Sequence, residues 1–476
     1  MEEIRLTPPV NLIQRQFKEA NVDYRDDFMR DRDRVMYSTA FRRLAGKTQI
    51  YTTGIDDHKR NRLTHTLEVS QIARTIAQAL KLDCNLAEAI ALGHDLGHTP
   101  FGHAGERMLH DIMVPNSDYV KHSPFYKICY CSVQQALKKE GVLSPNLYGF
   151  KHNLQSVRVA TVLEDSYRDD ENNNIGLNLT NYTLWGMMNH SKLRYSDVEE
   201  KYLNYHKQIL KHCSISKKSS SKLAEAWSLE AYIVELADEI SQWHHDLEDA
   251  LRGQAMFKDE ILKLVKDSLK DKITMEDVKK IDKLNVRKVL DRKYIADLSH
   301  VVVNTLITDI INTSRNNIEK LIDEIDKKGI SKESLFLDYE GQNFSIERSK
   351  IISFSEDLNY KEIKTAIRQK VHHSREVERM NEKGKYIIRK IFEAYCSHPQ
   401  QLPDGPIMHF MVETNNYKNI DEAKGTAIGE IRTKFNDMLE NGMPIHQRII
   451  LMRRICDHIA SMTDRYAIDE YKKLYD

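Results

Sequence analysis

The chain has 476 residues, of which 41% are hydrophobic and 30% charged, and its 71 Lys and Arg residues balance its 71 Asp and Glu residues. This composition excludes disordered and collagen-like chains, and the zero net charge gives no overall reason to bind nucleic acid or an anionic membrane. Apolar runs such as residues 300–311 are interrupted by Asn304 and Asp309, too soon for a membrane span. The first residues, MEEIRLTPPV, lack the basic and apolar regions of a signal peptide. We therefore expect a cytoplasmic protein without membrane contact.

Helical patterns dominate the chain. No proline occurs between Asn146 and His398, and glycine is scarce in that tract, which Leu, Ile, Lys, Glu and Asp fill. Such a tract favours helices over strands. In chain order, apolar residues recur at helical spacing over residues 63–80, 86–94, 223–251 and 387–395. The sequence predicts an all-α fold.

Two stretches are typical of peripheral structure. Residues 211–222 are rich in Ser and Lys and predict a loop, and residues 257–288 are rich in Lys and Asp and predict a solvated helical lobe. The six cysteines include no C-x-x-C pair, so neither a disulfide framework nor a zinc knuckle is indicated. We expect one large helical body over residues 1–476, divided into a core (30–255), a charged lobe (256–345) and a carboxyl-terminal region (346–476).

The most informative motif is the His94-Asp95 pair, which lies between Gly93 and Gly97 in ALGHDLGHTPFGHAGE. His65 precedes the pair by 29 residues. Imidazole and carboxylate ligands suit Mn, Fe, Co, Ni or Zn, and Mg when water fills the remaining positions. Adjacent helical residues point about 100° apart, so both can reach one ion only if it lies between neighbouring helices. The pattern predicts a metal site shared by several helices.

The fourth ligand must come from another part of the chain. Asp238 is the best candidate, because it is an acid in an otherwise apolar stretch of a predicted helix, where a carboxylate needs a partner. Taken alone, Asp238 is better explained as an acid on a helix surface.

His65, the His94-Asp95 pair and Asp238 resemble the H…HD…D signature of HD-domain metal-dependent phosphohydrolases. Further segments resemble the deoxyguanosinetriphosphate triphosphohydrolase (dGTPase) branch in the expected order. They are RDRDRVMYSTAFRRLAGKTQIY (30–51), NRLTHTLEV, HDLGHTPFGHAGE, GFKHNLQS (149–156), GLNLTNYTLWG (176–186), NEKGKYIIRKIFEAY (381–395) and ICDHIASMTDRYAIDEYKKLY (455–475).

The resemblance implies an HD-domain helical phosphohydrolase core with additional helical lobes. It also implies that the enzyme hydrolyses a deoxynucleoside triphosphate, dGTP among them, at the α-phosphorus to give the deoxynucleoside and inorganic triphosphate. His65, His94, Asp95 and Asp238 would hold one divalent ion per subunit, Mg²⁺ or Mn²⁺ in first place, with Fe, Co, Ni or Zn as alternatives. Such an ion would polarise the phosphate and lower the pKa of a water molecule.

The same resemblance implies residues for proton transfer. His103 and Glu106 lie three residues apart and would share one helical face, so Glu106 would orient His103 as a general acid or base. Without the resemblance, His103 would be read as a loop histidine that caps a helix. His98 and His152 match positions beside the phosphates, and the sequence does not rank them. Lys151 stands before His152 where the family pattern has an acid.

Residues for substrate binding also follow from the resemblance. Arg62 would hold the phosphates together with either Arg42 or Arg43, and of these two we expect Arg43. The positions expected to contact the sugar, base or phosphate are Gln49, Asp246, Tyr386 and Arg465.

One departure from the family pattern concerns the sugar. The residue four positions after Asp238 is commonly Tyr in the family, where it would clash with a 2′-hydroxyl, but here it is Gln242. The sequence therefore does not predict that this position discriminates deoxyribose from ribose. Trp243 could supply the bulk but is better explained by core packing. Family members form homo-oligomers, so the resemblance implies a tetramer or hexamer, with a nucleotide or single-stranded DNA as a further effector.

Two other functions stay open at this point. Another HD-domain phosphohydrolase, of the 5′-nucleotidase or guanosine tetraphosphate hydrolase type, would share the metal residues but would not explain the GLNLT and MTDRY segments. A nucleotide sensor or single-stranded nucleic-acid binder on the same fold would have no need of intact His103 and Glu106.

Overall fold

The computed structural model describes residues 6–8, 10, 13–19, 24–49, 60–113, 149–189, 228–252, 257–269, 272–286, 292–330, 348–358, 364–367, 369 and 375–476. Within these residues the regular elements are all helices, and extended backbone pairs only at isolated bridges such as Thr48 with Asn61. The predicted all-α fold is therefore confirmed. The loop predicted at residues 211–222 lies outside the described residues.

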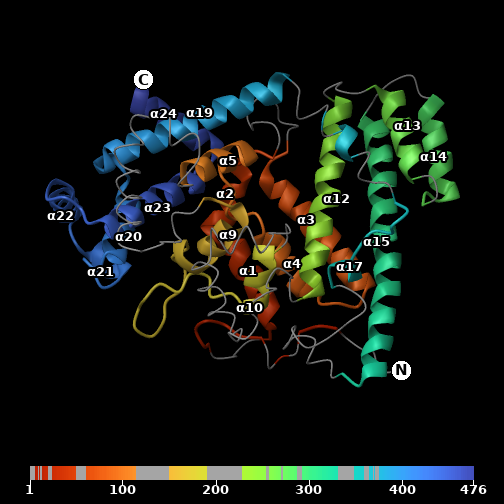
Figure 1. Cartoon of the computed structure of the whole chain (residues 1–476), viewed down its shortest axis with the longest axis horizontal. Helices are drawn as coiled ribbons and strands as arrows, with labels where there is room; N and C mark the ends of the chain where they lie inside the picture. Colours follow the sequence, from red (N-terminus) through yellow and green to blue (C-terminus); the bar gives the residue numbers. More distant parts are fainter. Residues whose placement is uncertain are drawn as a thin grey trace.

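The centre of the molecule is built from the first half of the chain (Figure 1). Its helices, including a 3₁₀ turn (η2) and a π-helical turn (η5), are α1 (Asp27–Tyr37), α2 (Thr39–Arg43), η2 (Leu44–Gly46), α3 (Arg62–Ala79), α4 (Cys84–Gly93), α5 (Gly102–Met113), α9 (His152–Arg158), η5 (Val159–Leu163), α10 (Asn181–Asn189) and α12 (Leu229–Arg252).

Local signals explain where the two helices of the HD motif begin. The Asn61 side chain accepts a hydrogen bond from the Thr64 amide, and the Asp83 carboxylate accepts hydrogen bonds from the Asn85 and Leu86 amides. Each side chain thus satisfies amide groups that have no partner within the first turn of a helix. These caps fix the first residues of α3 and α4, and therefore the positions of His65 and His94.

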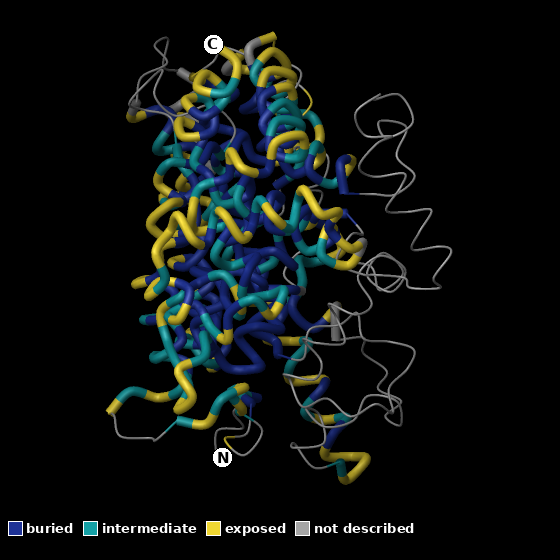
Figure 2. The backbone as a smooth tube through the Cα atoms, turned by 90° about the vertical axis from the view of Figure 1, so that its left-hand side faces the viewer, coloured by how far each residue is buried: buried dark blue, intermediate teal, exposed yellow. Residues whose placement is uncertain are grey.

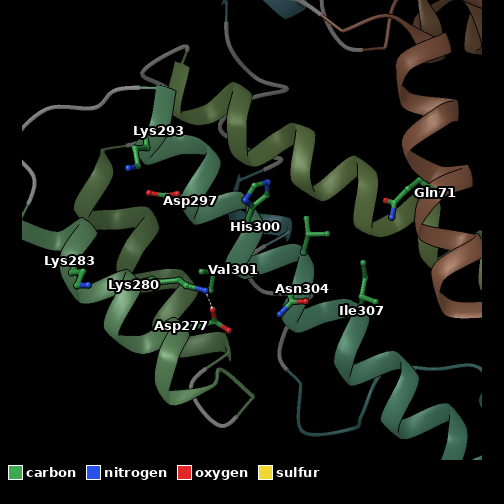
Figure 3. A pocket seen from close by; sticks show the side chains of 11 residues that line it. Gln71, Asp277, Lys280, Lys283, Lys293, Asp297, His300, Val301, Asn304 and Ile307 are labelled. Carbon is green, nitrogen blue, oxygen red and sulfur yellow. Dashed lines mark hydrogen bonds and ion pairs between the residues drawn. The ribbon is translucent and has the colours of Figure 1, made fainter. Parts of the chain in front are cut away.

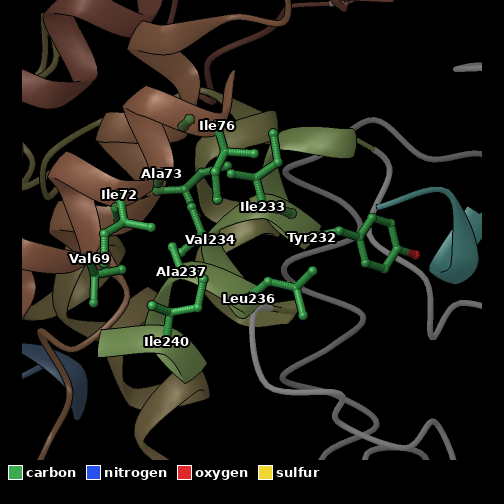
Figure 4. Packing of buried hydrophobic residues seen from close by; sticks show 14 of the residues in the cluster. Val69, Ile72, Ala73, Ile76, Tyr232, Ile233, Val234, Leu236, Ala237 and Ile240 are labelled. Atoms are coloured by element: carbon green, nitrogen blue, oxygen red, sulfur yellow. The ribbon is translucent and has the colours of Figure 1, made fainter. Parts of the chain in front are cut away.

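Packing between α3 and α12 forms the centre of the core. Val69, Ile72 and Ile76 of α3 lie against Val234 and Ile240 of α12, and all five are at most 5% exposed (Figure 4). Burying one such aliphatic side chain contributes about 1.5–3 kcal/mol. This apolar contact fixes how α3 and α12 are rotated about their axes, and the polar residues one turn away on each helix are thereby brought together.

Helix α4 is enclosed by its neighbours. It packs against α1, α3, α10 and α12, and its residues from Leu86 to Gly93 are buried with the exception of Glu88. A helix that is apolar on nearly all sides belongs inside a protein. The residues that follow it, His94 and Asp95, consequently enter the interior.

A lobe of three helices lies beside α12. It consists of α13 (Lys258–Leu269), α14 (Met275–Val286) and α15 (Arg292–Lys328). Of residues 257–288, for which helices were predicted, the described part contains α13 and α14. A groove of about 780 Å³ lies beside α14 and α15, and it carries Lys280, Lys293, Asp277 and Asp297 (Figure 3). Both signs of charge are therefore present on its walls.

Helix α15 is apolar over much of its length. By length and composition residues 293–328 could cross a membrane, with a mean hydropathy of 1.3 in the best window, although 56% of that window is buried inside the molecule. The mean hydropathy does not reveal that the apolar run of this helix is interrupted by the charged residue Asp309. The Asp309 carboxylate accepts hydrogen bonds from the Ser355 amide (2.8 Å) and hydroxyl (2.7 Å). These are the contacts of a helix packed against protein.

The last part of the chain builds a second apolar core against α5. Figure 2 shows buried residues along the interior of the whole body and exposed residues on its outside. The elements of this part, including the 3₁₀ turn η6, are α19 (Arg375–Ser397), η6 (Pro399–Gln401), α20 (Asp404–Glu413), α21 (Ile420–Gly425), α22 (Ile428–Glu440), α23 (Ile445–Ser461) and α24 (Asp464–Tyr475). The short helix α17 (Arg348–Ile351) precedes them and packs against α12 and α15 of the first core.

Candidate active site

Three helices bring the four predicted metal ligands together. His65 is on α3, His94 and Asp95 directly follow α4, and Asp238 is in the middle of α12. His65 Nε2 lies 2.9 Å from Asp238 Oδ1, and His94 Nε2 lies 3.4 Å from Asp95 Oδ1 and 4.0 Å from Asp238 Oδ1. His65, His94 and Asp95 are buried, whereas the Asp238 side chain is 17% exposed. Solvent therefore reaches this cluster at Asp238, whereas protein encloses the other three side chains.

The two imidazole rings are held by their Nδ1 atoms. His94 Nδ1 lies 2.6 Å from the Ala91 carbonyl oxygen, and His65 Nδ1 lies 3.2 Å from the Ser241 hydroxyl oxygen. Both Nε2 atoms therefore face the carboxylates. Histidine ligands of metals are usually oriented in this way, by a hydrogen bond at the nitrogen that does not bind the ion.

The donor set fits a divalent cation. Burial alone would raise the pKa of Asp95, but His94 and Arg62 hold it well below its usual value. Burial likewise opposes ionisation of Asp238, whereas the hydrogen bond with His65 lowers its pKa. Two anionic carboxylates and two imidazole nitrogens are a common ligand set for Mn, Fe, Co, Ni and Zn.

Gly97 lets helix α9 approach the turn that follows His94 and Asp95. A Cβ atom on Gly97 would lie 2.2 Å from the Ser156 nitrogen and 2.4 Å from the His152 carbonyl oxygen. The Gly97 amide donates to the Ser156 hydroxyl oxygen (2.9 Å), which in turn donates to the His94 carbonyl (2.8 Å). Only a residue without a side chain permits this contact. It places His152, the first residue of α9, beside the metal ligands.

Four further residues form a second cluster around one carboxylate. Glu106 Oε2 lies 2.9 Å from His103 Nδ1, and Glu106 Oε1 lies 3.0 Å from His152 Nδ1. The rings of His98 and His152 are stacked with their centroids 4.2 Å apart. Glu106 therefore supplies the acidic partner of His152 that the sequence lacks at Lys151.

The pKa values of the three histidines in this cluster are shifted in different directions. Burial lowers the pKa of His98 well below its usual value, and burial also lowers that of His103, against the opposing effect of Glu106. Burial would lower the pKa of His152 too, but the Glu106 carboxylate raises it above its usual value. The pKa of Glu106 itself is well below its usual range, because His152 and His103 outweigh its burial. Near neutral pH His98 and His103 are neutral, and His152 is the ring that more readily carries a proton.

The two clusters are continuous. His98 Nε2 lies 3.7 Å from Asp95 Oδ1, so one side chain of each cluster faces the other. The structure thus places the candidate metal ligands and the histidines predicted to transfer protons side by side, on or next to α3, α4, α5, α9 and α12.

Two family models match parts of the chain. The model described as HD domain matches residues 62–126, and the model described as phosphohydrolase-associated domain matches residues 352–418 and 433–473. Among curated relatives, a deoxyguanosinetriphosphate triphosphohydrolase-like protein of Leptospira interrogans is 32% identical over 462 residues, covering 97% of this chain and 92% of that protein. A protein of the same name from Rickettsia felis is 31% identical over 472 residues, covering 97% of this chain and 94% of that protein.

This chain belongs to the dGTPase-like family of HD-domain proteins. It is accordingly a phosphohydrolase of helical fold, with residues that could hold a metal ion.

Three of the residues predicted to bind substrate in this dGTPase-like chain lie at or near the clusters. Arg62 is buried and its Nη1 atom donates to Asp95 Oδ2 at 2.7 Å. The backbone oxygen of Gln49 and the Arg62 guanidinium both lie beside the Cβ position of Gly102, next to His103. Asp246 is buried on α12, two turns after Asp238.

The other three are further from the histidines. Arg43 is exposed and lines a small cavity beside Gly97. Tyr386 on α19 is 45% exposed and contacts Tyr471, and Arg465 on α24 is almost fully exposed and pairs with Asp469 at 3.7 Å. Within the described part of the chain, no contact joins Tyr386 or Arg465 to the two clusters. Their substrate roles stay predictions.

Sequence reasoning missed several residues of this region. Asp464, next to the predicted Arg465, accepts hydrogen bonds from the amides of Thr48 (3.0 Å) and Phe101 (2.9 Å), and so ties α24 to the loop before His103. Gln242, noted only as a departure, donates at 3.0 Å to both oxygens of Asp238. The spacing of four residues on one helix was the available signal for Gln242. No local signal identifies Asp464.

Proposed function

We propose that the protein is a metal-dependent dNTP triphosphohydrolase with dGTP among its substrates. The observation that carries the proposal is the contact between the His65, His94, Asp95 and Asp238 cluster and the histidines around Glu106. A phosphoester hydrolase needs an electrophilic site and proton-transfer groups within reach of one phosphorus atom. The names of the relatives support dGTP as the substrate to test first.

The metal would be held by His65, His94, Asp95 and Asp238, one ion per chain, with Mn²⁺ or Mg²⁺ as the first choices. Bound there, a divalent ion supplies Lewis-acid polarisation of a phosphate oxygen and lowers the pKa of a water molecule. The second oxygen of Asp95 is held by Arg62. Arg62 therefore orients this ligand and adds positive charge where the phosphates would lie.

His103 and His152 divide the proton transfers in this proposal. A neutral His103, oriented by Glu106, accepts a proton from the attacking water as the bond from its oxygen to the α-phosphorus forms. His152, whose pKa Glu106 raises, donates a proton to the 5′-oxygen as the bond between that oxygen and the α-phosphorus breaks. The products are the deoxynucleoside and inorganic triphosphate. His98, neutral and stacked on His152, would position that ring and donate a hydrogen bond to phosphate.

Substrate binding and assembly complete the proposal. Arg43 would contact the outer phosphates, Gln49 and Asp246 the sugar, and Tyr386 and Arg465 the base or a phosphate. We also propose that the protein forms a homo-oligomer, either a tetramer or a hexamer, and that a nucleotide or single-stranded DNA acts as an effector. A cytoplasmic location is likewise proposed.

The test is product analysis. The purified chain is incubated with each dNTP and with GTP, in Mn²⁺ or Mg²⁺, and the products are separated so that triphosphate, pyrophosphate and phosphate are distinguished. Deoxynucleoside with triphosphate is the expected result, and comparison of dGTP with GTP reports the sugar preference left open by Gln242. Absence of triphosphate from every substrate and nucleotide mixture would favour another HD-domain phosphohydrolase or a nucleotide sensor.

A further inference from the structure

A second histidine-rich cluster lies next to the candidate metal site on the same two helices. Glu68 follows His65 by one turn of α3, and His244 and His245 lie on α12 beyond Asp238. Glu68, His244 and His245 each place one potential ligand atom within 4.8 Å of the other two. Neither the predicted metal ligands nor the proton-transfer groups include these residues.

The side chains of this cluster converge on one carboxylate. His245 Nε2 contacts Glu68 Oε2, and His244 Nδ1 lies 3.6 Å from the same oxygen. Adjacent residues of a helix point about 100° apart, so both rings reach Glu68 only because it lies between their directions. The His94-Asp95 pair uses its two adjacent side chains in a similar way.

A second carboxylate and one arginine border the cluster. Glu248 Oε1 lies 3.3 Å from His244 Nε2, which adds a second carboxylate to the cluster. The Arg60 guanidinium lies 2.6 Å from Glu248 Oε2 and 3.5 Å from Glu68 Oε1, so a cation bound at the cluster competes with Arg60 for these carboxylates. The His245 side chain is 2% exposed and that of Glu68 is 35% exposed, so the cluster is deep on one side and accessible to ions from solvent on the other.

We propose that Glu68, His244 and His245 form a second divalent-cation site, distinct from the one at His65, His94, Asp95 and Asp238. Two imidazole nitrogens and one carboxylate oxygen suit Zn²⁺, Mn²⁺, Fe²⁺ or Co²⁺, with water in the remaining positions. The site joins α3 to α12 one to two turns from the pair His65 and Asp238, which join the same helices.

A single hydroxyl connects the two sites. Ser241 Oγ lies 3.2 Å from His65 Nδ1 and 3.4 Å from Glu68 Oε2. An ion on Glu68 would therefore hold the group that orients His65. Partners of metal ligands at this distance change metal affinity by about 10–100-fold when they are removed. The second ion thus has a structural and tuning role, and the inference does not depend on the substrate of the enzyme.

Metal stoichiometry tests the site without any use of turnover. The full chain is stripped with a chelator and titrated with Mn²⁺ alone or Zn²⁺ alone, and bound metal is measured by calorimetry and elemental analysis. We expect two ions per chain in the wild type and one in His244→Ala and in Glu68→Gln. Asp238→Ala is expected to lose the other ion, and His300→Ala, which removes an exposed histidine from α15, is expected to keep both.

The variants separate this inference from the proposed function. If His244→Ala and Glu68→Gln, both folded by circular dichroism, bind as many ions as the wild type, the second site does not exist. A wild type that hydrolyses dGTP with one ion per chain, lost in Asp238→Ala alone, overturns the second site and leaves the function in place. If the wild type binds two ions but releases no triphosphate, the second site is supported and the proposed function is wrong.

Discussion

Glu106 contacts two histidines whose pKa values are shifted in opposite directions. Its two oxygens contact His103 and His152 separately, yet the pKa of His103 is lowered and that of His152 is raised. Burial dominates at His103, whereas the Glu106 charge prevails over burial at His152. A pair of like groups with divergent pKa values is a common arrangement for a general base and a general acid.

Replacing Glu106 with Gln is expected to move the pH profile of kcat/KM toward acid. The carboxylate stabilises the imidazolium form, so its loss lowers the pKa of both rings. The alkaline limb, where His152 loses its proton, and the acid limb, where His103 gains one, should both shift down. Steady-state rates between pH 5 and 9 measure this, and a profile that stays in place would contradict the assignment.

Removing the His103 ring is expected to reduce kcat by about 10²–10⁴-fold, which is the usual contribution of a proton-transfer group. Bound metal should remain at the wild-type level, because His103 is not among the four ligands. His446→Ala, which removes an exposed histidine from α23, serves as the control and should retain kcat. A His103→Ala variant with normal kcat but less bound metal would show that His103 is a ligand and not a proton-transfer group.

At the scale of elements, the contact of α9 with the turn after His94 decides whether the two clusters meet. That contact depends on Gly97, since a side chain there would overlap the backbone of Ser156 and His152. The helices themselves can form from local signals, but their approach needs this one position to be without a Cβ atom.

The Gly97→Ala variant is therefore expected to lose activity and to destabilise the fold by about 1–3 kcal/mol, the usual cost of overpacking. Gly429→Ala is the matched control, because Gly429 is exposed in α22 and has no atom within 4 Å of its Cβ position. Alanine also favours a helix by up to about 1 kcal/mol over glycine, so the control should be as stable as the wild type or more stable. Urea unfolding followed by circular dichroism compares them, and equal stability of the two variants would refute the close approach.

At the scale of the whole molecule, a buried ion pair joins the first half of the chain to the last. Arg158 Nη2 of α9 lies 2.6 Å from Asp457 Oδ2 of α23, and both side chains are at most 6% exposed. Burial opposes ionisation of Asp457, but Arg158 and Arg453 lower its pKa to about 2. The carboxylate therefore stays ionised and holds α23 against the helix that begins with His152.

Truncation of Asp457 to Ala is expected to destabilise the protein by about 3–5 kcal/mol, because the buried Arg158 guanidinium would lose the carboxylate that compensates its charge. Asp469→Ala removes an exposed partner of Arg465 and should change stability by less than about 1 kcal/mol. Because the folded pKa of Asp457 is below its unfolded value near 3.8, its contribution is complete above about pH 4 and is lost as pH falls toward 2. Urea unfolding at pH 7 and at pH 3 measures both effects, and equal losses for the two variants would contradict this role.

The metal residues were predictable and their surroundings were not. Residue type and spacing identified His65 and the His94-Asp95 pair, and the family resemblance supported Asp238. The structure brings the four together, although their roles stay predictions. Glu68, Ser241 and His244 were missed, because each is unremarkable within its own helix. Their significance comes from the rotation of α3 against α12, which the buried side chains of both helices fix jointly.

Local information in the sequence determined the helices, their caps and the family, since helical periodicity and capping act over a few residues and the family motifs keep their order along the chain. The tertiary structure decided which groups share a proton, a carboxylate or an ion. Glu106 meets His152 across 46 residues and Arg158 meets Asp457 across 299. Such pairs depend on how whole helices pack, and packing is set by the shapes of buried side chains from every part of the chain at once.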